Sequence, residues 1–268
     1  MDIVYIVLGL GKRLVDMQVY VVSIEQKDSP RLLKFLSQSF FQKGIKYTQV
    51  GIKGGELAAK LYFDQAVKGR KRPLSPGELG CSLSHLQALE LFLKTEEKCA
   101  LIFEDDAILP DFLEPNNLAE QIQTLNLPEN ILLSLGGIQM KECKKVRGKF
   151  IDRQIFDRKI LAVVPDFYRR VNYAVAYVVD RKMAETLLAY HQPIRCADDW
   201  SYLYDFNSSV NLWMTHLIDH PVIARGENNL ALSTLEVERS SGVDVAQSRY
   251  GTWWGKNLSK ILNHKYSK

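Results

Sequence analysis

The chain has 268 residues, 46% of them hydrophobic, so it can bury a large core and is long enough for one large α/β domain or two small ones. Its 35 Lys and Arg residues against 31 Asp and Glu residues give a net charge of +4, which permits anionic ligands or a membrane surface but is too small to indicate nucleic-acid binding. The four cysteines form no Cys-x-x-Cys pair, which excludes a zinc ribbon and fits a reducing cytosol.

The first apolar segment, IVYIVLGLG (3–11), has about half of the roughly 20 residues that a membrane span needs, and no small-residue cleavage site follows it. We therefore expect no signal peptide and no transmembrane helix, and a cytoplasmic protein. A fresh first strand begins at Met17, so residues 1–16 are expected to be an appended, dispensable extension.

Further along the chain, apolar runs of strand length alternate with helical patterns. The runs are VYVVSI (19–24), GIKYTQV (44–50), CALIF (99–103), ILLSLGG (131–137) and AVAYVV (174–179). This alternation predicts an α/β fold with a mainly parallel central sheet flanked by helices. The charged region 139–170 interrupts it, and we consider either an inserted flap or hairpin over one sheet edge or a solvated surface loop.

The segment LSPGELGCSLSHLQALELFLK (74–94) predicts a helix. Ser75, Pro76 and Glu78 match a capping box with proline at the first helical position. Leucines at three- and four-residue steps predict the face toward the core: Leu79, Leu83, Leu86, Leu89 and Leu93.

The first turns of this helix carry candidates for binding an anion such as phosphate, because unpaired N–H groups and the positive helix end lie there. Glu78, Cys81, Ser82 and His85 lie on the faces of these turns away from the leucines, and from this helix we take Glu78, Ser84 and His85 as candidates for binding the sugar donor. The simpler alternatives make Glu78 only a cap and His85 a packed or surface histidine.

The buried strand CALIF ends in three consecutive acids, Glu104, Asp105 and Asp106. In sheets of this class, ligands bind beyond the carboxyl ends of the strands. Adjacent carboxylates repel one another unless a cation or hydrogen-bond donors compensate, and Mg²⁺ or Mn²⁺ bound with a substrate diphosphate would do so. The alternation of side chains along a strand places Glu104 and Asp106 on the same side. One of the three acids is therefore expected to serve another role, such as binding a ribose hydroxyl or capping the backbone. The alternative is an acidic turn that caps the next segment.

A second acidic pair, Asp198 and Asp199, precedes Trp200, Tyr202 and Tyr204. Aromatic rings suit the apolar faces of sugars, and a carboxylate can accept the proton of an acceptor hydroxyl. We therefore take Asp198 or Asp199 as the candidate general base and Trp200 and Tyr202 as acceptor-binding candidates. Alternatively, Asp198 only caps the next helix.

The segments SPGELGCSLSHLQAL, ALIFEDDAIL and CADDW, in this order and after VYVVSIEQKDSPR, resemble glycosyltransferase family 25, the lipooligosaccharide galactosyltransferase group of Gram-negative bacteria. The resemblance covers about residues 17–225. It implies a GT-A-type, Rossmann-like nucleotide-binding fold and a UDP-sugar donor, usually UDP-galactose. It also implies a divalent metal, inversion at the anomeric carbon, and a β-linked product on a lipooligosaccharide or lipopolysaccharide core.

Carried over by motif, the resemblance implies Asp106 as the first metal ligand and Asp105 or Glu104 as a ribose or second metal contact. It places Ser23 and Arg31 near the uridine or diphosphate. GT-A enzymes often add a metal ligand from the C-terminal half, where WMTHLIDHPVIAR (213–225) offers His216, Asp219 and His220. Of these three we select His216 as the further metal ligand. The β-branched residues and the proline of this segment predict a strand followed by a turn.

We divide the chain into the extension 1–16, a transferase domain 17–230 and a C-terminal lid and helical tail 231–268. The final helix combines basic residues with five apolar ones, Trp253, Trp254, Leu258, Ile261 and Leu262. Such a helix can rest on the cytoplasmic face of an anionic inner membrane, close to a lipid-linked acceptor. The alternative is packing on the enzyme's own core.

Two other classes of protein are considered. A glycoside hydrolase also needs two carboxylates, but it does not need a metal-suited acid cluster beside an anion-binding helix start. A non-catalytic nucleotide-sugar or glycan-binding module would gain nothing from concentrating negative charge at that position.

Overall fold

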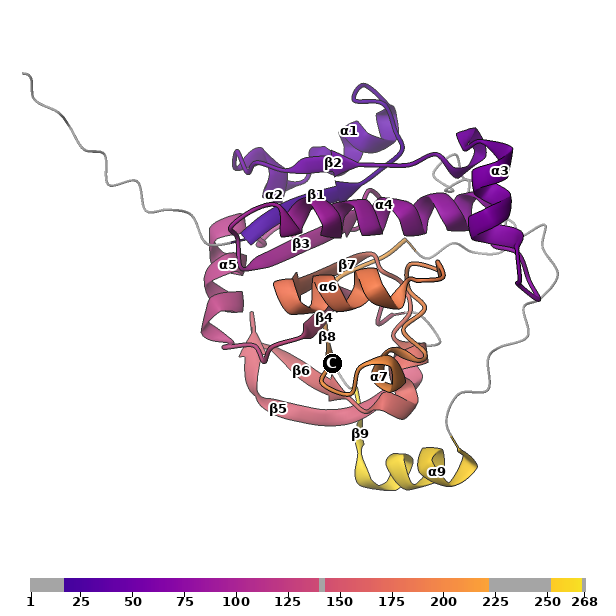
Figure 1. Cartoon of the computed structure of the whole chain (residues 1–268). Coiled ribbons are helices and arrows are strands. Elements are labelled where there is room, and N and C mark those ends of the chain that lie inside the picture. The colour runs from indigo at the N-terminus through magenta and orange to yellow at the C-terminus, as the bar shows by residue number, and fades with distance from the viewer. Residues whose placement is uncertain (1–16, 140–142, 222–251, 267–268) are drawn as a thin grey trace, which may run out of the picture.

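The computed structural model describes residues 17–139, 143–221 and 252–266, and nine strands in these ranges form one sheet (Figure 1). The strand order across the sheet is β2-β1-β3-β7-β4-β8-β6-β5-β9. The strands are β1 Met17–Val22, β2 Thr48–Val50, β3 Cys99–Glu104, β4 Ile131–Gly136, β5 Arg147–Ile155, β6 Arg158–Val163, β7 Ala176–Asp180, β8 Asn211–Ile218 and β9 His264–Lys265.

The strand directions confirm the α/β class but correct the expectation of a mainly parallel sheet, which is mixed. Pairing is parallel between β1 and β2, β1 and β3, and β4 and β8, and the other described neighbours are antiparallel. A buried apolar run such as β7 carries no information on strand direction, which explains the error. Because β7 lies antiparallel between β3 and β4, the carboxyl ends of β1, β3, β4 and β8 still meet at one edge.

Helices cover both faces of the sheet. The described helices are α1 Pro30–Leu36, α2 Ser39–Gln42, α3 Ala59–Tyr62, α4 Pro76–Leu93, α5 Pro115–Thr124, α6 Arg181–Tyr190, α7 Leu203–Phe206 and α9 Trp253–Leu262, with short helices η1 Gly54–Glu56, η2 Phe63–Val67, η3 Cys143–Lys145 and η4 Pro165–Arg170. α4 and α6 pack on one face through residues such as Phe92 and Leu187. α1, α2 and α5 pack on the other face through residues such as Phe35 and Leu118.

The helix α4 confirms the prediction made from its sequence. Ser75 Oγ accepts a hydrogen bond from Glu78 N (3.1 Å), and Ser75 N donates to Glu78 Oε2 (2.9 Å), which completes the capping box. A Cβ at Gly80 would lie 2.5 Å from the carbonyl oxygen of Ile52, so only glycine allows this close approach of α4 to the loop after β2. The start of α4 is thereby held beside the carboxyl ends of β1 and β3.

Within the charged region 139–170, residues 147–163 form the hairpin that we considered for it. β5 and β6 pair antiparallel and add two strands to the sheet. Phe156 and Asp157 connect them with φ of 47° and 60°, as a two-residue turn of the I′ kind requires.

The predicted domain boundaries fall partly outside the described residues. The extension 1–16 and the lid within 231–251 both lie there, so they stay predictions. The predicted final helix is present as α9, and none of its residues is buried. Its apolar residues therefore do not pack on the described core. Among the described residues, no helix has the length and apolar character to cross a bilayer.

Candidate active site

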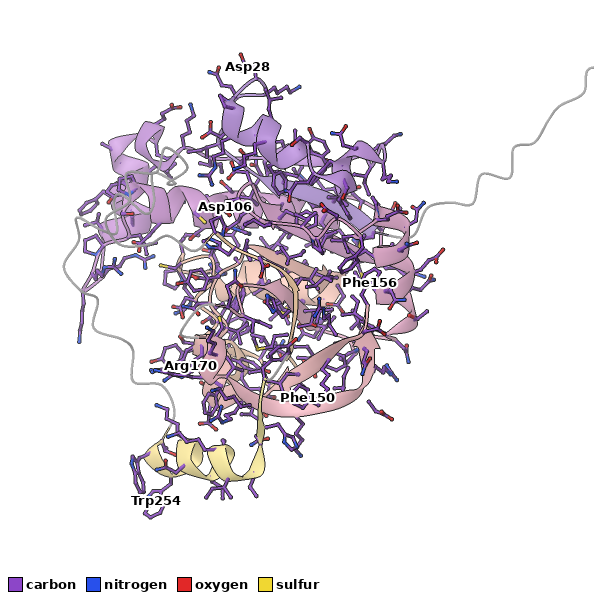
Figure 2. The ribbon with its side chains drawn as sticks, turned by 180° about the vertical axis from the view of Figure 1, so that it is seen from behind. Asp28, Asp106, Phe150, Phe156, Arg170 and Trp254 are labelled. Carbon is purple, nitrogen blue, oxygen red and sulfur yellow. The ribbon has the colours of Figure 1, made fainter. Side chains whose placement is uncertain are left out.

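The candidate site lies at the sheet edge where the carboxyl ends of β1, β3 and β8 meet. Ser23 follows β1, Glu104 ends β3 with Asp105 and Asp106 directly after it, and His220 follows β8. Backbone hydrogen bonds between Ile108 and Asp219 (2.9 and 3.0 Å) join the segment after β3 to the segment after β8. Figure 2 labels Asp106 at this edge.

The negative charge of Asp105 is compensated by hydrogen-bond donors of the protein. Its Oδ1 accepts hydrogen bonds from Arg31 Nε (2.8 Å) and Nη2 (2.6 Å), and its Oδ2 accepts one from Ser23 Oγ (2.5 Å). Arg31 comes from α1 and Ser23 from the end of β1, so Asp105 ties both elements to β3. The structure thus brings together three of the residues predicted to contact the sugar donor, and both carboxylate oxygens of Asp105 bind protein groups.

Glu104 is oriented by a buried histidine. His85 Nε2 lies 3.2 Å from Glu104 Oε1, and His85 Nδ1 lies 2.9 Å from the Tyr177 hydroxyl. A carboxylate only accepts hydrogen bonds, so Glu104 accepts from Nε2, and in the neutral ring Nδ1 then accepts from the Tyr177 hydroxyl, whose pKa burial raises well above 10. This assigns the Nε2 proton to the hydrogen bond with Glu104. His85 is therefore both packed and connected to the acids, and Tyr177 is a site residue that the sequence does not predict.

Asp106 is the least compensated of the three acids. Its Oδ2 lies 3.2 Å from Arg31 Nη2 and 3.7 Å from His220 Nε2. Its Oδ1 is buried with no hydrogen-bond partner among the described residues. Burial first, and then the negative charge of Glu104, raise the pKa of Asp106 to about 6.

Glu104, Asp106 and His220 form a donor set for a metal ion, with one ligand atom from each lying within 4.8 Å of the others. His220 Nδ1 donates to the Pro221 carbonyl oxygen (2.8 Å), so in the neutral ring Nε2 carries the lone pair that faces Asp106. Two atoms that each lie about 2.1 Å from one cation are at most about 4.2 Å apart, so the 3.7 Å between His220 Nε2 and Asp106 Oδ2 fits such a pair. Two carboxylates and one imidazole suit Mn²⁺.

A second donor set shares Glu104 and adds Cys81 and His85 from α4. Thiolate and imidazole ligands would favour Zn²⁺. Both ring nitrogens of His85 already make the hydrogen bonds to Tyr177 and Glu104, however. The set with His220 is therefore the better metal site.

His220 replaces His216 as the histidine beside the acids. His216 lies within β8, four residues before His220, which follows the end of the strand. Its Nε2 is 2.6 Å from Asp219 Oδ1, and its backbone N donates to the Tyr266 hydroxyl (2.9 Å). The pairing of Ile108 with Asp219, which no local pattern reveals, decides which histidine reaches the site.

Two residues predicted to bind the sugar donor have structural roles instead. Both carboxylate oxygens of Glu78 are occupied, one by Ser75 N and the other by Arg72 Nη2 (3.2 Å), so the cap interpretation is confirmed. Ser84 is fully buried, where it donates to the Gly80 carbonyl oxygen (2.7 Å) and accepts from Ile52 N (2.8 Å). Both residues hold α4 and the loop after β2, and neither meets the acids.

Asp198 is connected to the site by Tyr173, which bonds to Asp198 and contacts His220. Its Oδ2 accepts a hydrogen bond from Tyr173 N (3.0 Å), and the Tyr173 and His220 rings lie 5.5 Å apart. The next helix, α7, has no side-chain cap, so the interpretation of Asp198 as its cap is wrong. Asp199 Oδ1 instead accepts from Ser201 N (3.2 Å) in its own turn.

The two aromatic candidates differ in exposure. Trp200 is 1% exposed and packs edge-on to Tyr177, with ring centroids 6.4 Å apart. It has no open face for a sugar, which corrects its predicted role as an acceptor-binding residue. Tyr202 is exposed and stays a candidate.

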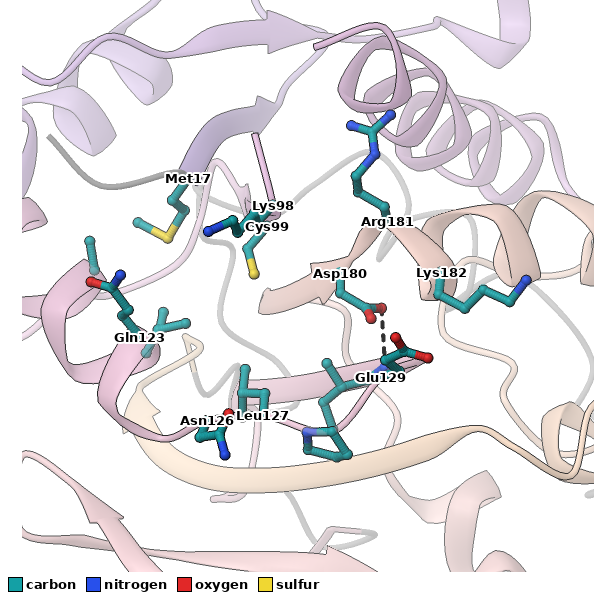
Figure 3. A pocket seen from close by; sticks show the side chains of 14 residues that line it. Met17, Lys98, Cys99, Gln123, Asn126, Leu127, Glu129, Asp180, Arg181 and Lys182 are labelled. Atoms are coloured by element: carbon teal, nitrogen blue, oxygen red, sulfur yellow. Dashed lines mark hydrogen bonds between the residues drawn. The ribbon is translucent and has the colours of Figure 1, made fainter. Parts of the chain in front are cut away.

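A cavity of about 510 Å³ lies at the opposite sheet edge (Figure 3). It is lined by residues at the amino ends of β3 and α6, among them Cys99, Asp180 and Lys182. Asp180 there caps α6 and accepts hydrogen bonds from Asn130 N (2.8 Å) and Ile131 N (3.2 Å). None of the predicted site residues lines this cavity, so its size does not mark the site.

Comparison with known proteins assigns the family. Residues 16–202 match the family described as Glycosyltransferase family 25 (LPS biosynthesis protein). A Haemophilus influenzae strain Rd protein named "Putative glycosyltransferase" is 26% identical over 196 residues, which cover 70% of this chain and 63% of that protein. The match thus spans less than two thirds of that relative's length.

The solved structures that resemble this chain have low sequence identity and low TM-scores. A197 from STIV is 14% identical with a TM-score of 0.40, covering 77% of this chain and 86% of that one. Mannose-1-phosphate geranyltransferase from Thermus thermophilus is 12% identical with a TM-score of 0.38, covering 77% of this chain and 75% of that one. The family match covers well over half of the chain and includes the SPGELG, FEDD and CADD segments, and the chain therefore belongs to glycosyltransferase family 25.

Proposed function

We propose that this glycosyltransferase moves a hexose, with galactose as the expected sugar, from a UDP-sugar to a terminal sugar of a lipooligosaccharide or lipopolysaccharide core. The observation that carries the proposal is the set Glu104, Asp106 and His220 at the carboxyl edge of the sheet. The buried, unpartnered Oδ1 of Asp106 adds to it, because a buried carboxylate oxygen without a partner is costly unless a ligand satisfies it.

The residues beside this set suit a nucleotide diphosphate. Glu104, Asp106 and His220 would hold Mn²⁺ or Mg²⁺, and such an ion supplies positive charge that stabilises a departing diphosphate. The guanidinium of Arg31, fixed by Asp105, brings a further positive charge to within 3.2 Å of Asp106 Oδ2. His85 holds the Glu104 carboxylate in place.

The chemical step requires one base. We assign it to Asp198, because its partner Tyr173 contacts His220, with Asp199 as the alternative. The carboxylate accepts the proton of the acceptor hydroxyl while that oxygen bonds to the anomeric carbon and the bond from this carbon to the UDP oxygen breaks. A single displacement of this kind inverts the anomeric configuration and forms no covalent enzyme intermediate.

The free cysteines and the family membership are both consistent with the proposed transfer reaction. All four cysteines are free thiols, as a cytoplasmic location would require. Family membership favours transfer over the hydrolase and over the binding module without turnover.

The test is UDP release from a panel of UDP-sugars, with and without acceptors ending in different sugars, in Mn²⁺ and in EDTA. We expect release from one UDP-sugar that the acceptor stimulates and that EDTA abolishes. Asp106→Asn should lower the rate by at least about 100-fold, whereas Asp111→Asn, an exposed acid in the same loop, should leave it unchanged. Turnover that is independent of metal, or no turnover of any UDP-sugar, would contradict the proposal.

A further inference from the structure

The helix α9 turns its apolar face away from the rest of the protein. Its exposed large apolar residues are Trp253, Trp254, Leu258, Ile261 and Leu262. Trp254 is 77% exposed and Ile261 80% exposed, and Figure 2 shows Trp254 pointing away from the body of the molecule. The half-buried positions Gly255, Lys256 and Ser259 lie on the other side. We propose that α9 docks the protein on an anionic lipid membrane surface.

The orientation of α9 is fixed by contacts at both of its ends. At its start, the backbone of Gly255 lies so close to η4 that a Cβ there would be 3.3 Å from Asp166 Oδ1. After its end, β9 pairs with β5, and the buried Tyr266 accepts the hydrogen bond from His216 N. The exposed face is therefore presented by the fold and is not the consequence of a loosely attached tail.

Positive charge gathers beneath this face. Lys256 lies close enough to Arg169 and Arg170 of η4 that their charges, after burial, lower its pKa. Lys260 lies one turn further along α9, and Lys265 follows in β9. One acid, Asp166, lies close enough to Lys256 to act on it in the opposite direction and raise its pKa. Such a cluster complements the negative headgroups of anionic lipids, which attract basic residues next to a membrane.

The composition of α9 favours a membrane over a second copy of the chain. Tryptophan with aliphatic residues on one face and lysine on the other is typical of helices that lie in the lipid interface. A ten-residue helix is about 15 Å long, which is short for the roughly 800 Å² per partner of a stable dimer interface. A dimer through α9 would also bring two basic clusters together.

The proposal rests on α9 and its surroundings, so it does not depend on the proposed transfer reaction. Where the acceptor is lipid-linked, docking would place the enzyme on the surface that carries its substrate. The test is co-sedimentation of the full chain with vesicles of phosphatidylcholine alone and with about 30% phosphatidylglycerol, without sugar donor or acceptor.

We expect the chain to bind the phosphatidylglycerol vesicles, with a blue shift of tryptophan emission. The double variant Trp254→Ser/Ile261→Ser should bind at least about tenfold more weakly. The control Leu61→Ser/Phe63→Ser removes two other exposed apolar side chains and should bind like the parent. Lys256→Gln/Lys260→Gln, or about 0.5 M NaCl, should weaken binding several-fold by removing or screening charge.

Three outcomes would overturn the proposal. They are no binding to either vesicle, equal binding by the Trp254→Ser/Ile261→Ser variant, or a concentration-dependent dimer that this variant abolishes. Circular dichroism and UDP-sugar turnover with a soluble acceptor establish that the variant is folded. Vesicle binding without any turnover would refute the proposed function and leave the membrane proposal standing.

Discussion

His220 Nε2 lies 3.7 Å from Asp106 Oδ2, although the two residues are separated by more than a hundred positions in the chain. This distance is too long for a hydrogen bond and fits two atoms that bind the same cation. The backbone pairing of Ile108 with Asp219 produces it. The relationship makes the acidic strand end a candidate metal site in the tertiary structure.

The first prediction distinguishes the two histidines of this segment. His220→Gln should weaken Mn²⁺ binding at least about tenfold, because it removes one of three protein ligands. Calorimetric titration with Mn²⁺ measures this directly. His216→Gln is the matched control and should keep the parent affinity, because His216 bonds to Asp219. The reverse result would restore His216 as the ligand.

The second prediction concerns the charge of Asp106. Its pKa in the folded protein, about 6, lies above the ordinary 3.8, so the folded state disfavours the ionised form. Stability from this group is present at low pH and is lost as the pH rises from about 4 to about 6. In EDTA at about pH 7.5, Asp106→Asn should therefore raise the free energy of unfolding by about 1–3 kcal/mol.

Urea unfolding in EDTA and in Mn²⁺ tests this second prediction. In Mn²⁺ the order should reverse, because only the parent gains the free energy of metal binding. A variant that is less stable than the parent in EDTA would show that Asp106 is already compensated in the metal-free protein.

The third prediction addresses Arg31. Arg31→Lys keeps the positive charge but loses the two-nitrogen contact with Asp105, so the positions of α1 and Asp105 should loosen. We expect KM for the UDP-sugar to rise at least about tenfold and the free energy of unfolding to fall by about 1–2 kcal/mol. Steady-state kinetics and urea unfolding check both values, with Lys34→Gln on the exposed side of α1 as the control. An unchanged KM would exclude Arg31 from binding of the sugar donor.

The fourth prediction compares the two candidate bases. Asp198→Asn should lower kcat by about 10²–10⁴-fold, the usual contribution of a general base, while Mn²⁺ and UDP binding stay unchanged. The asparagine oxygen can still accept the hydrogen bond from Tyr173 N, so the fold should be retained. Asp199→Asn should have a much smaller effect. The opposite pattern would make Asp199 the base, and two active variants would exclude both.

The fifth prediction concerns stability in acid. His191 is buried, and burial lowers its pKa from 6.5 to about 4. Since the unfolded chain binds this proton more readily, stability is lost as the pH falls from 6.5 toward 4, by up to about 1.4 kcal/mol per pH unit. His191→Gln should flatten this loss in urea unfolding at several pH values. His264→Gln, at an exposed histidine, should leave it unchanged.

Local interactions were predictable from the sequence alone. The start of α4 depends on contacts among Ser75, Pro76 and Glu78, which are three residues apart at most. The buried strand before Glu104 also follows from a pattern within a short window, whereas the sequence left the charged region open between a flap or hairpin and a surface loop. The acidic strand end could be placed at the binding edge because ligands gather there in sheets of this class.

The composition of the site was decided by pairings between distant segments. The register of the segment after β8 against the segment after β3 selects His220 over His216. The position of α1 brings Arg31 into contact with Asp105, and Trp200 is buried in the core against Tyr177. The antiparallel insertion of β7 places Tyr177 beside His85. Hydrogen bonds between neighbours in sequence can be predicted from local residue patterns, whereas strand direction and register depend on the packing of the whole sheet.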